Sequence, residues 1–194
     1  MNVTNRHAHA RYGYRMISET DYYNLLRNVI ETKLKGYLSL NAHLPLEVQH
    51  PRAFSRPNRG LNFIRFGERL KKLFKIKLFW ENAPAQKYQT WDLKFGQTDW
   101  NNVPDSIDLT LDTGHLILGA KNITDARTRI ETVLQDRGKQ IKHLHLHEND
   151  LAHDTHEPVG KIIDKTLLAK LTQNRTYIFE KAVFRMIVFR DVFY

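Results

Sequence analysis

The chain has 194 residues, with 30 lysines and arginines against 21 aspartates and glutamates, so its formal net charge is +9 with histidine neutral. A hydrophobic share of 41% and a charged share of 26% are typical of a globular protein and argue against a fibre or a disordered chain. The length fits one domain over residues 1–194 better than two. No stretch approaches the length of uncharged apolar residues that a membrane span needs, and the N-terminus lacks a basic-then-apolar signal pattern. We therefore expect no contact with a membrane and a cytoplasmic location.

The residues available for chemistry are restricted by the absence of cysteine. Without thiols the chain forms no disulfide, no thiolate metal site, no iron–sulfur cluster and no cysteine nucleophile. It does carry 10 histidines, several of them in dense clusters. Any metal ion must therefore be held by histidine, aspartate and glutamate.

Short apolar runs alternate with helical patterns along the chain, which is typical of βα units around a parallel sheet. The first helix is predicted over residues 18–35, where Ser18 and Asp21 form a capping box and Gly36 ends the helix. The apolar tail over residues 183–194 is predicted to be one more strand or a docking helix. The other predicted elements are, in chain order, strand 37–43, helix 61–74, strand 76–81, strand 107–112, helix 124–137, strand 141–147, helix 164–172 and strand 176–180.

Successive predicted strands end on an ionisable residue. In a parallel barrel the C-terminal ends of the strands converge on one face, so residues far apart in the sequence meet there. Carboxylates and imidazoles that converge in this way form a divalent-metal site of oxygen and nitrogen ligands. One charged strand end is commonplace, whereas a series of them indicates a shared site. The residues are His43, Glu81, Asp112, His145 or His147, and Glu180.

Two neighbouring segments strengthen this interpretation. Asp112 and His115 are separated by Thr-Gly, and the glycine permits a tight turn at the strand end. The histidines of the segment 143–147 alternate with leucines, so all three side chains should lie on one face of the strand. Asp154 and His156 follow on a loop. Each pattern alone is common on protein surfaces, but together they favour a metal centre.

These segments resemble a known superfamily, the xylose isomerase-like TIM barrels. That superfamily includes sugar-phosphate isomerases and epimerases and the endonuclease IV-type AP endonucleases (AP endonuclease family 2). The resemblance extends from about residue 37 to residue 181. It is carried by Phe79-Trp-Glu-Asn-Ala-Pro84, by Leu109-Thr-Leu-Asp-Thr-Gly-His115, and by His145-Leu-His-Glu-Asn followed by Asp154-Thr-His-Glu-Pro-Val-Gly160.

The resemblance implies an α/β fold, a (β/α) TIM barrel that is shorter than usual. A complete barrel of this type takes roughly 250 residues. The present chain begins almost directly at what looks like the second strand, so the first βα unit is missing. Six strands are expected, counting an early strand around His7 or His9 at the start of the chain, with the tail as a seventh.

The resemblance also implies roles for individual residues. The metal site shared across the superfamily corresponds here to Glu81, Asp112, His145 and Glu180. The nuclease-like branch uses further ligands on other strands and loops. The matching positions here are His115, Asp154, His156, His43 and either His7 or His9, of which we choose His9.

Two chemistries are compatible with these residues. In the first, one Mn, Mg, Co or Zn ion binds a sugar or sugar phosphate, and Glu81 and Glu180 transfer a proton through an enediolate. Glu148 is then expected to orient the imidazole of His145. In the alternative, two or three zinc ions hydrolyse a DNA phosphodiester. We place the isomerase or epimerase first because the His-Leu-His-Glu-Asn segment is more similar to that branch.

A basic stripe and the short length leave two further questions. Residues 52–77 contain nine lysines and arginines but only one glutamate, a composition that could serve DNA binding. Most of them fall on a helix expected outside the barrel, so a solvated face is the simpler interpretation. The missing βα unit leaves a third hypothesis open, namely a non-catalytic relic or a homo-oligomer in which a partner supplies the missing strand.

Overall fold

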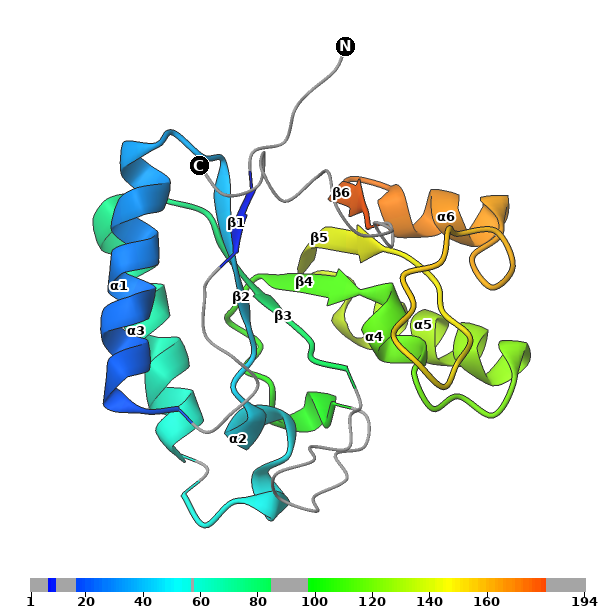
Figure 1. Ribbon diagram of the computed structural model, residues 1–194, viewed down its shortest axis with the longest axis horizontal. Helices are drawn as coiled ribbons and strands as arrows, with labels where there is room; N and C mark the ends of the chain where they lie inside the picture. The colour runs from blue at the N-terminus through cyan, green and yellow to red at the C-terminus, as the bar shows by residue number, and fades with distance from the viewer. Residues whose placement is uncertain (1–6, 10–16, 57, 85–97, 181–194) are drawn as a thin grey trace.

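The computed structural model describes residues 7–9, 17–56, 58–84 and 98–180. In these ranges six strands form one sheet in the order β1-β2-β3-β4-β5-β6, and every neighbouring pair is parallel. Strands that follow one another in the sequence are thus neighbours in the sheet, as in a barrel. The sheet is curled, and its strands turn progressively from β1 to β6 (Figure 1). The strands are β1 His7–His9, β2 Ser39–His43, β3 Leu78–Glu81, β4 Leu109–Asp112, β5 Ile141–Leu146 and β6 Thr176–Phe179. The predicted fold, an α/β TIM barrel in shortened form, is confirmed.

Helices connect the strands and cover the outside of the curled sheet (Figure 1). Helices α1 and α3 pack against each other beside β1 to β3, and α5 and α6 lie beside β4 to β6. Short helical turns follow the C-terminal ends of β2 and β4. The helices are α1 Glu19–Leu34, α2 Leu46–Gln49, α3 Asn58–Phe74, α4 Thr113–Ile117, α5 Ile123–Arg137 and α6 Lys165–Thr172, with 3-10 turns at Pro51–Ala53 and Trp100–Asn102.

Local sequence signals set the helix ends. The Asp21 carboxylate accepts hydrogen bonds from the backbone N–H of Ser18 at 2.8 Å and from its hydroxyl at 2.7 Å, and Gly36 has a φ of +64°, so the predicted start and end of α1 are confirmed. The prediction for α3 began three residues late, because Asn58 and Arg59 lack the apolar periodicity that marked the helix. The tail over residues 183–194 lies outside the described residues.

Strands β2 to β5 are largely buried on both faces, but the two faces differ in character, whereas β6 is mostly exposed. Side chains alternate along a strand, so every second residue points to the same side. One set, including Leu40, Trp80 and Leu144, belongs to the hydrophobic core shared with the helices. The other set faces the inside of the curled sheet and is mostly polar, and in β2 to β5 it is buried almost throughout. It includes Asn41, Glu81, Thr110, Asp112, His143 and His145.

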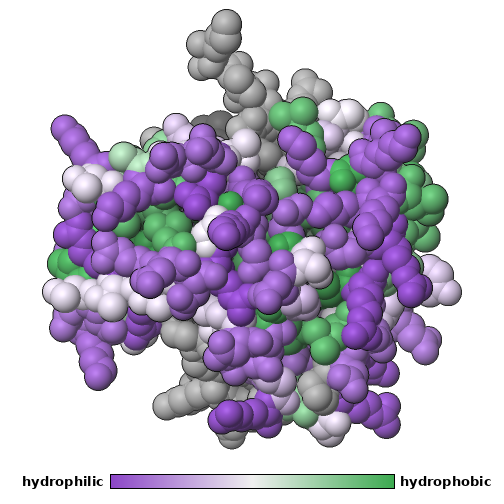
Figure 2. Space-filling model, turned by 180° about the vertical axis from the view of Figure 1, so that it is seen from behind, coloured by the Kyte–Doolittle hydropathy of each residue, from purple (hydrophilic) through white to green (hydrophobic). Residues whose placement is uncertain are grey.

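The helical exterior is polar. The face seen from behind is covered mostly by hydrophilic side chains (Figure 2). Arg65, Arg69 and Lys72 are exposed on α3, while Lys71 binds the Asp108 carboxylate at 2.6 Å. The basic stripe therefore lies on an outer helix, as expected. None of the helices in the described ranges is long and apolar enough to cross a membrane.

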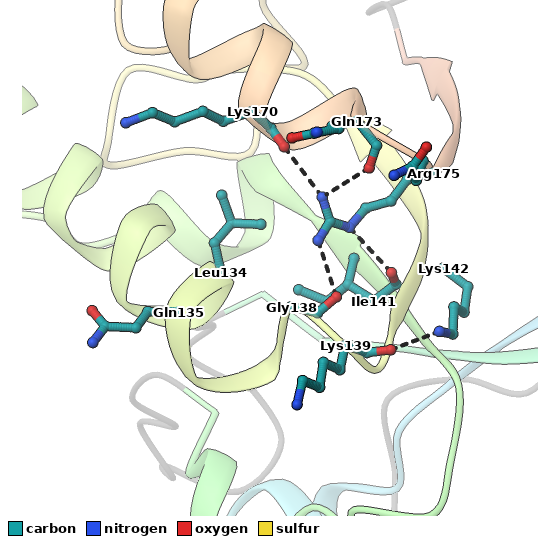
Figure 3. A pocket seen from close by; sticks show the side chains of 10 residues that line it. Leu134, Gln135, Gly138, Lys139, Ile141, Lys142, Lys170, Gln173 and Arg175 are labelled. Carbon is teal, nitrogen blue, oxygen red and sulfur yellow. Dashed lines mark hydrogen bonds between the residues drawn. The ribbon is translucent and has the colours of Figure 1, made fainter.

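A pocket of about 540 Å³ lies where β5 and β6 begin, at the end of the sheet opposite to the predicted metal ligands (Figure 3). Arg175, just before β6, donates hydrogen bonds to the carbonyl oxygens of Ile141 at 3.1 Å, Gly138 at 3.0 Å and Leu171 at 3.0 Å. One guanidinium group thus fastens the ends of α5 and α6 to β5. Its donors are used for structure, and the lysines around the pocket are exposed.

We predict that Gly67→Ala destabilises the fold. A Cβ atom on this α3 residue would lie 2.6 Å from Cζ2 of Trp80 and 3.1 Å from Cδ2 of Leu78. Trp80 is fully buried and its indole N–H donates to Glu68 at 3.0 Å, so the ring has no room to retreat. The destabilisation by overpacking is ~1–3 kcal/mol. It exceeds the stabilisation that alanine contributes through its higher helix propensity, which is at most ~1 kcal/mol. Urea denaturation should show a lower free energy of unfolding, whereas exposed Arg69→Ala changes it by less than ~0.5 kcal/mol; equal or greater stability of Gly67→Ala would contradict the packing described.

Candidate metal centre

Four side chains from four neighbouring strands meet at the C-terminal end of the sheet. Glu81 ends β3, Asp112 ends β4, His145 lies near the end of β5, and Glu180 directly follows β6. Nδ1 of His145 lies 3.1 Å from Oε1 of Glu81 and 3.1 Å from Oε1 of Glu180, and 3.7 Å from Oδ2 of Asp112. Three carboxylates from three strands therefore surround one imidazole nitrogen. This is the convergence that the strand ends predicted.

A second group of ligands adjoins the first. Oδ1 of Asp112 lies 3.0 Å from Nε2 of His147, so the two oxygens of one carboxylate face the two groups. Oδ2 of Asp154 lies 3.5 Å from Nε2 of His115 and 3.5 Å from Nε2 of His156. The rings of His147 and His156 are stacked, with centroids 4.0 Å apart. Asp112 thus bridges two adjacent clusters of metal-ligand atoms.

Other predicted ligands border these clusters. Nε2 of His43 lies 3.7 Å from Oε2 of Glu81, and Nδ1 of His156 lies 3.4 Å from Oε2 of Glu180. His9 lies in β1, in register with Asn41 of β2, and its side chain is outside the described part of the structure. All predicted site residues with described side chains come together: His43, Glu81, Asp112, His115, His145, Asp154, His156 and Glu180.

His147 lies among these clusters, although the sequence marked it only as an alternative strand end and not as a candidate ligand. Its alternation with His143 and His145 is the signal that could have placed it there. The role expected of Gly114 was also wrong: it lies inside α4 rather than in a tight turn. A Cβ atom on Gly114 would overlap the imidazole of His147. The glycine is therefore needed for the close approach of this ring and not for a turn.

Glu148 does not orient the imidazole of His145, which corrects a second expectation. Its carboxylate accepts hydrogen bonds from four consecutive backbone N–H groups, those of residues 160–163, at 2.7 to 3.1 Å. Glu148 is also bridged to Glu157 by two backbone hydrogen bonds of 2.8 and 2.7 Å. Both contacts close the loop that carries Asp154 and His156. Glu148 thus holds the second cluster in place from behind.

The ionisable side chains of the centre shift one another's pKa values strongly because most of them are buried. Burial alone would raise the pKa of the Glu81 carboxyl, but the charges of His145 and His43 outweigh it and lower that pKa to about 2. Burial alone would lower the pKa of His115, yet Asp112, Asp154 and Glu81 raise it to about 10. The pKa of His145 lies well above its usual value through Glu81 and Asp112, again against burial. At neutral pH His115 and His145 therefore supply positive charge that the carboxylates require.

The donor set fits divalent cations. Oδ2 of Asp112 and Oδ1 of Asp154 are buried, and neither accepts a hydrogen bond from any described residue. Such buried acceptor atoms are costly unless something positive binds them. The described residues form three sets of possible ligands, and within each set the ligand atoms lie within 4.8 Å of one another. All of these atoms are carboxylate oxygens and imidazole nitrogens. The sets are Glu81, Asp112 and His145; Asp112, His115 and His147; and His147, Asp154 and His156.

No protein-family model and no curated protein matches this sequence. Two solved structures do share its architecture. One is a D-tagatose 3-epimerase-like protein, with a TM-score of 0.64 and 17% identity over 91% of this chain and 70% of that one. The other is the TTHB071 protein from Thermus thermophilus, soaked with ZnCl2, with a TM-score of 0.60 and 15% identity over 89% of this chain and 70% of that one. The chain has the fold of the xylose isomerase-like TIM barrels. It spans about 70% of the length of each of these two proteins.

We predict that Gly114→Ala reduces the metal content of the protein. The added methyl group would displace the ring of His147, which belongs to two of the three ligand sets. Elemental mass spectrometry of the purified variant should find fewer ions per chain than in the wild type.

Gly119→Ala is the matched control for this substitution. Its Cβ would meet nothing within 4 Å, so it displaces no ligand side chain, while its φ of +70° makes the substitution costly in stability. Gly119→Ala should therefore keep its metal. An unchanged metal content in Gly114→Ala would show that His147 does not bind metal.

Proposed function

We propose that this chain is a divalent-metal-dependent isomerase or epimerase of a sugar or sugar phosphate. The observation that carries the proposal is the meeting of Glu81 and Glu180 at His145 Nδ1, with Asp112 beside them. Two carboxylates and a metal site in one cluster are what proton transfer next to a carbonyl requires. The structural similarity to a D-tagatose 3-epimerase-like protein supports the same class of substrate.

The residues that would hold the ion are Glu81, Asp112, His145 and Glu180. Carboxylate and imidazole ligands suit Mn, Mg, Co or Zn. A bound divalent ion would polarise neighbouring sugar oxygens and acidify the C–H bond between them. The chain itself supplies the groups that move the proton.

The two glutamates differ in access and basicity. The Glu180 side chain is 22% exposed, whereas that of Glu81 is 2% exposed. Burial raises the pKa of Glu180, and the negative charges of Asp112 and Glu81 add to this effect against the attraction of His145. Glu180 is thus the stronger base and the one that solvent or a substrate can reach. Glu81 would face the substrate from the opposite side and complete the transfer.

A second candidate function is hydrolysis of a DNA phosphodiester by two or three zinc ions. It is favoured by the second cluster, His147, Asp154 and His156, which one ion does not need. The exposed lysines and arginines of α3 lie on the outside of the sheet, and so they would not contact a DNA strand bound at the strand ends. We therefore keep the isomerase or epimerase as the first proposal.

Both candidates can be tested with one set of protein samples. The metal-loaded protein is assayed with a panel of ketoses and ketose phosphates, and separately with a duplex that contains an abasic site. Conversion of a sugar to its isomer or epimer supports the proposal. Cleavage of the duplex without sugar turnover would overturn the first proposal in favour of the second candidate. The absence of both activities would contradict both candidates.

We predict that Glu180→Gln lowers turnover by about 100-fold or more, because a glutamine cannot accept the proton. The far-UV circular dichroism spectrum should stay that of the wild type, since Glu180 lies after the end of β6. Glu157→Gln serves as the control: this carboxylate contacts the Thr155 hydroxyl at 3.3 Å and belongs to none of the ligand sets. Undiminished turnover with unchanged metal content in Glu180→Gln would contradict the assigned role.

A further inference from the structure

Two polar residues that the proposed chemistry does not use flank Glu81 inside the curled sheet. Asn41 lies on β2 and Thr110 on β4, the two strands that pair with β3 on either side. Thr110 is directly opposite Glu81 in the register. All three side chains are buried, with at most 2% of each residue exposed. Their hydrogen bonds must therefore be made with one another or with other protein groups.

The hydrogen bonds among these residues have a defined direction. The Thr110 hydroxyl donates to Oδ1 of Asn41 at 2.7 Å. The Asn41 amide nitrogen, Nδ2, donates to Oε2 of Glu81. If the amide turned over, its oxygen would face a carboxylate oxygen and its NH₂ group would face the hydroxyl. The ionised Glu81 carboxylate can only accept, so it selects the orientation in which Asn41 is its donor, and the Thr110 hydroxyl holds the amide oxygen in place by donating to it.

This relay decides which oxygen of Glu81 faces the metal ligands. Oε2 is held by Asn41, while Oε1 lies 3.1 Å from Nδ1 of His145. A buried carboxylate without such a donor could rotate about its last bond and would carry an uncompensated oxygen. The amide holds Oε2 and thereby leaves Oε1 directed at the centre. Hydrogen bonds behind a ligand act in this way on many metal sites.

We propose that Asn41 and Thr110 are positioning residues, which fix the Glu81 carboxylate as a metal ligand through the relay from Thr110 to Asn41 to Glu81. The inference rests on the proposed function in that it takes Glu81 to be a ligand. It goes further because it assigns a task to two residues outside the ligand set. The hydrogen bonds of this pair link the three strands β2, β3 and β4. The bond from Thr110 to Asn41 joins residues that are 69 positions apart in the sequence.

The test is a Co²⁺ titration of the full chain after treatment with a chelator, followed by visible absorption. Thr110→Val has the shape of threonine but lacks the hydroxyl, so the buried Asn41 Oδ1 loses its donor and the amide is no longer held against Glu81. Its affinity for the Co²⁺ ion at Glu81 should fall by about 10- to 100-fold, as is usual when a group behind a ligand is removed. Thr110→Ser keeps the hydroxyl and should bind like the wild type.

A second variant and two controls separate positioning from stability. Asn41→Leu removes the donor itself and should weaken binding at least as much as Thr110→Val. Thermal unfolding of the cation-free proteins measures how much each substitution affects the fold alone. His147, Asp154 and His156 form a ligand set to which neither Glu81 nor Asn41 belongs. A Co²⁺ equivalent bound there should keep its affinity in every variant.

The outcomes are distinct for this inference and for the proposed function. A selective loss of one Co²⁺ equivalent in Thr110→Val, restored in Thr110→Ser, supports the positioning role. Equal Co²⁺ affinity in the wild type, Thr110→Val and Asn41→Leu overturns it and leaves the proposed function standing. A wild-type chain that binds no Co²⁺ contradicts both.

Discussion

The structure depends on balancing negative charge that is gathered where water has little access. Glu81 and Asp112 are buried almost completely, and Asp154 and Glu180 are each 22% exposed at the side chain. Isolated buried carboxylates cost several kcal/mol each, so each must meet a positive partner. In the chain alone those partners are protonated histidines, with the pKa of His115 at about 10. A divalent cation on the same atoms would satisfy the requirement more directly, because it would bind several carboxylates at once.

The sheet is suited to this task because its two faces differ. The outward residues of the strands form an ordinary apolar core with the helices. The inward residues are polar and lie in successive layers, so that Asn41 and Thr110 stand behind Glu81 and Thr176 contacts the His143 ring at 2.8 Å. A polar interior is costly unless its groups are hydrogen-bonded. The polar residues in the layer below the carboxylates therefore hydrogen-bond to one another and also support the site above them.

Much of this arrangement could be predicted from the sequence. The strand-end residues were visible because each closes an apolar run, and parallel strands bring such ends together. The start of α1 was predictable from Ser18 and Asp21, which interact locally. The tasks of Gly114, Glu148 and Asn41 were not, because each depends on a partner 12 to 69 residues away. Spacing along a chain carries information about neighbours on one helix or strand, and says little about which side chain stands behind another across a sheet.

Anomalous diffraction from crystals grown with Zn²⁺ would show whether the strand ends hold a divalent cation. We expect a peak among Glu81, Asp112, His145 and Glu180, with any further peak beside His147, Asp154 and His156. The number of peaks also bears on the chemistry, since one favours the isomerase or epimerase and two or three favour the phosphodiester hydrolase. A well-ordered crystal with no anomalous peak at the strand ends would show that these residues do not bind the cation.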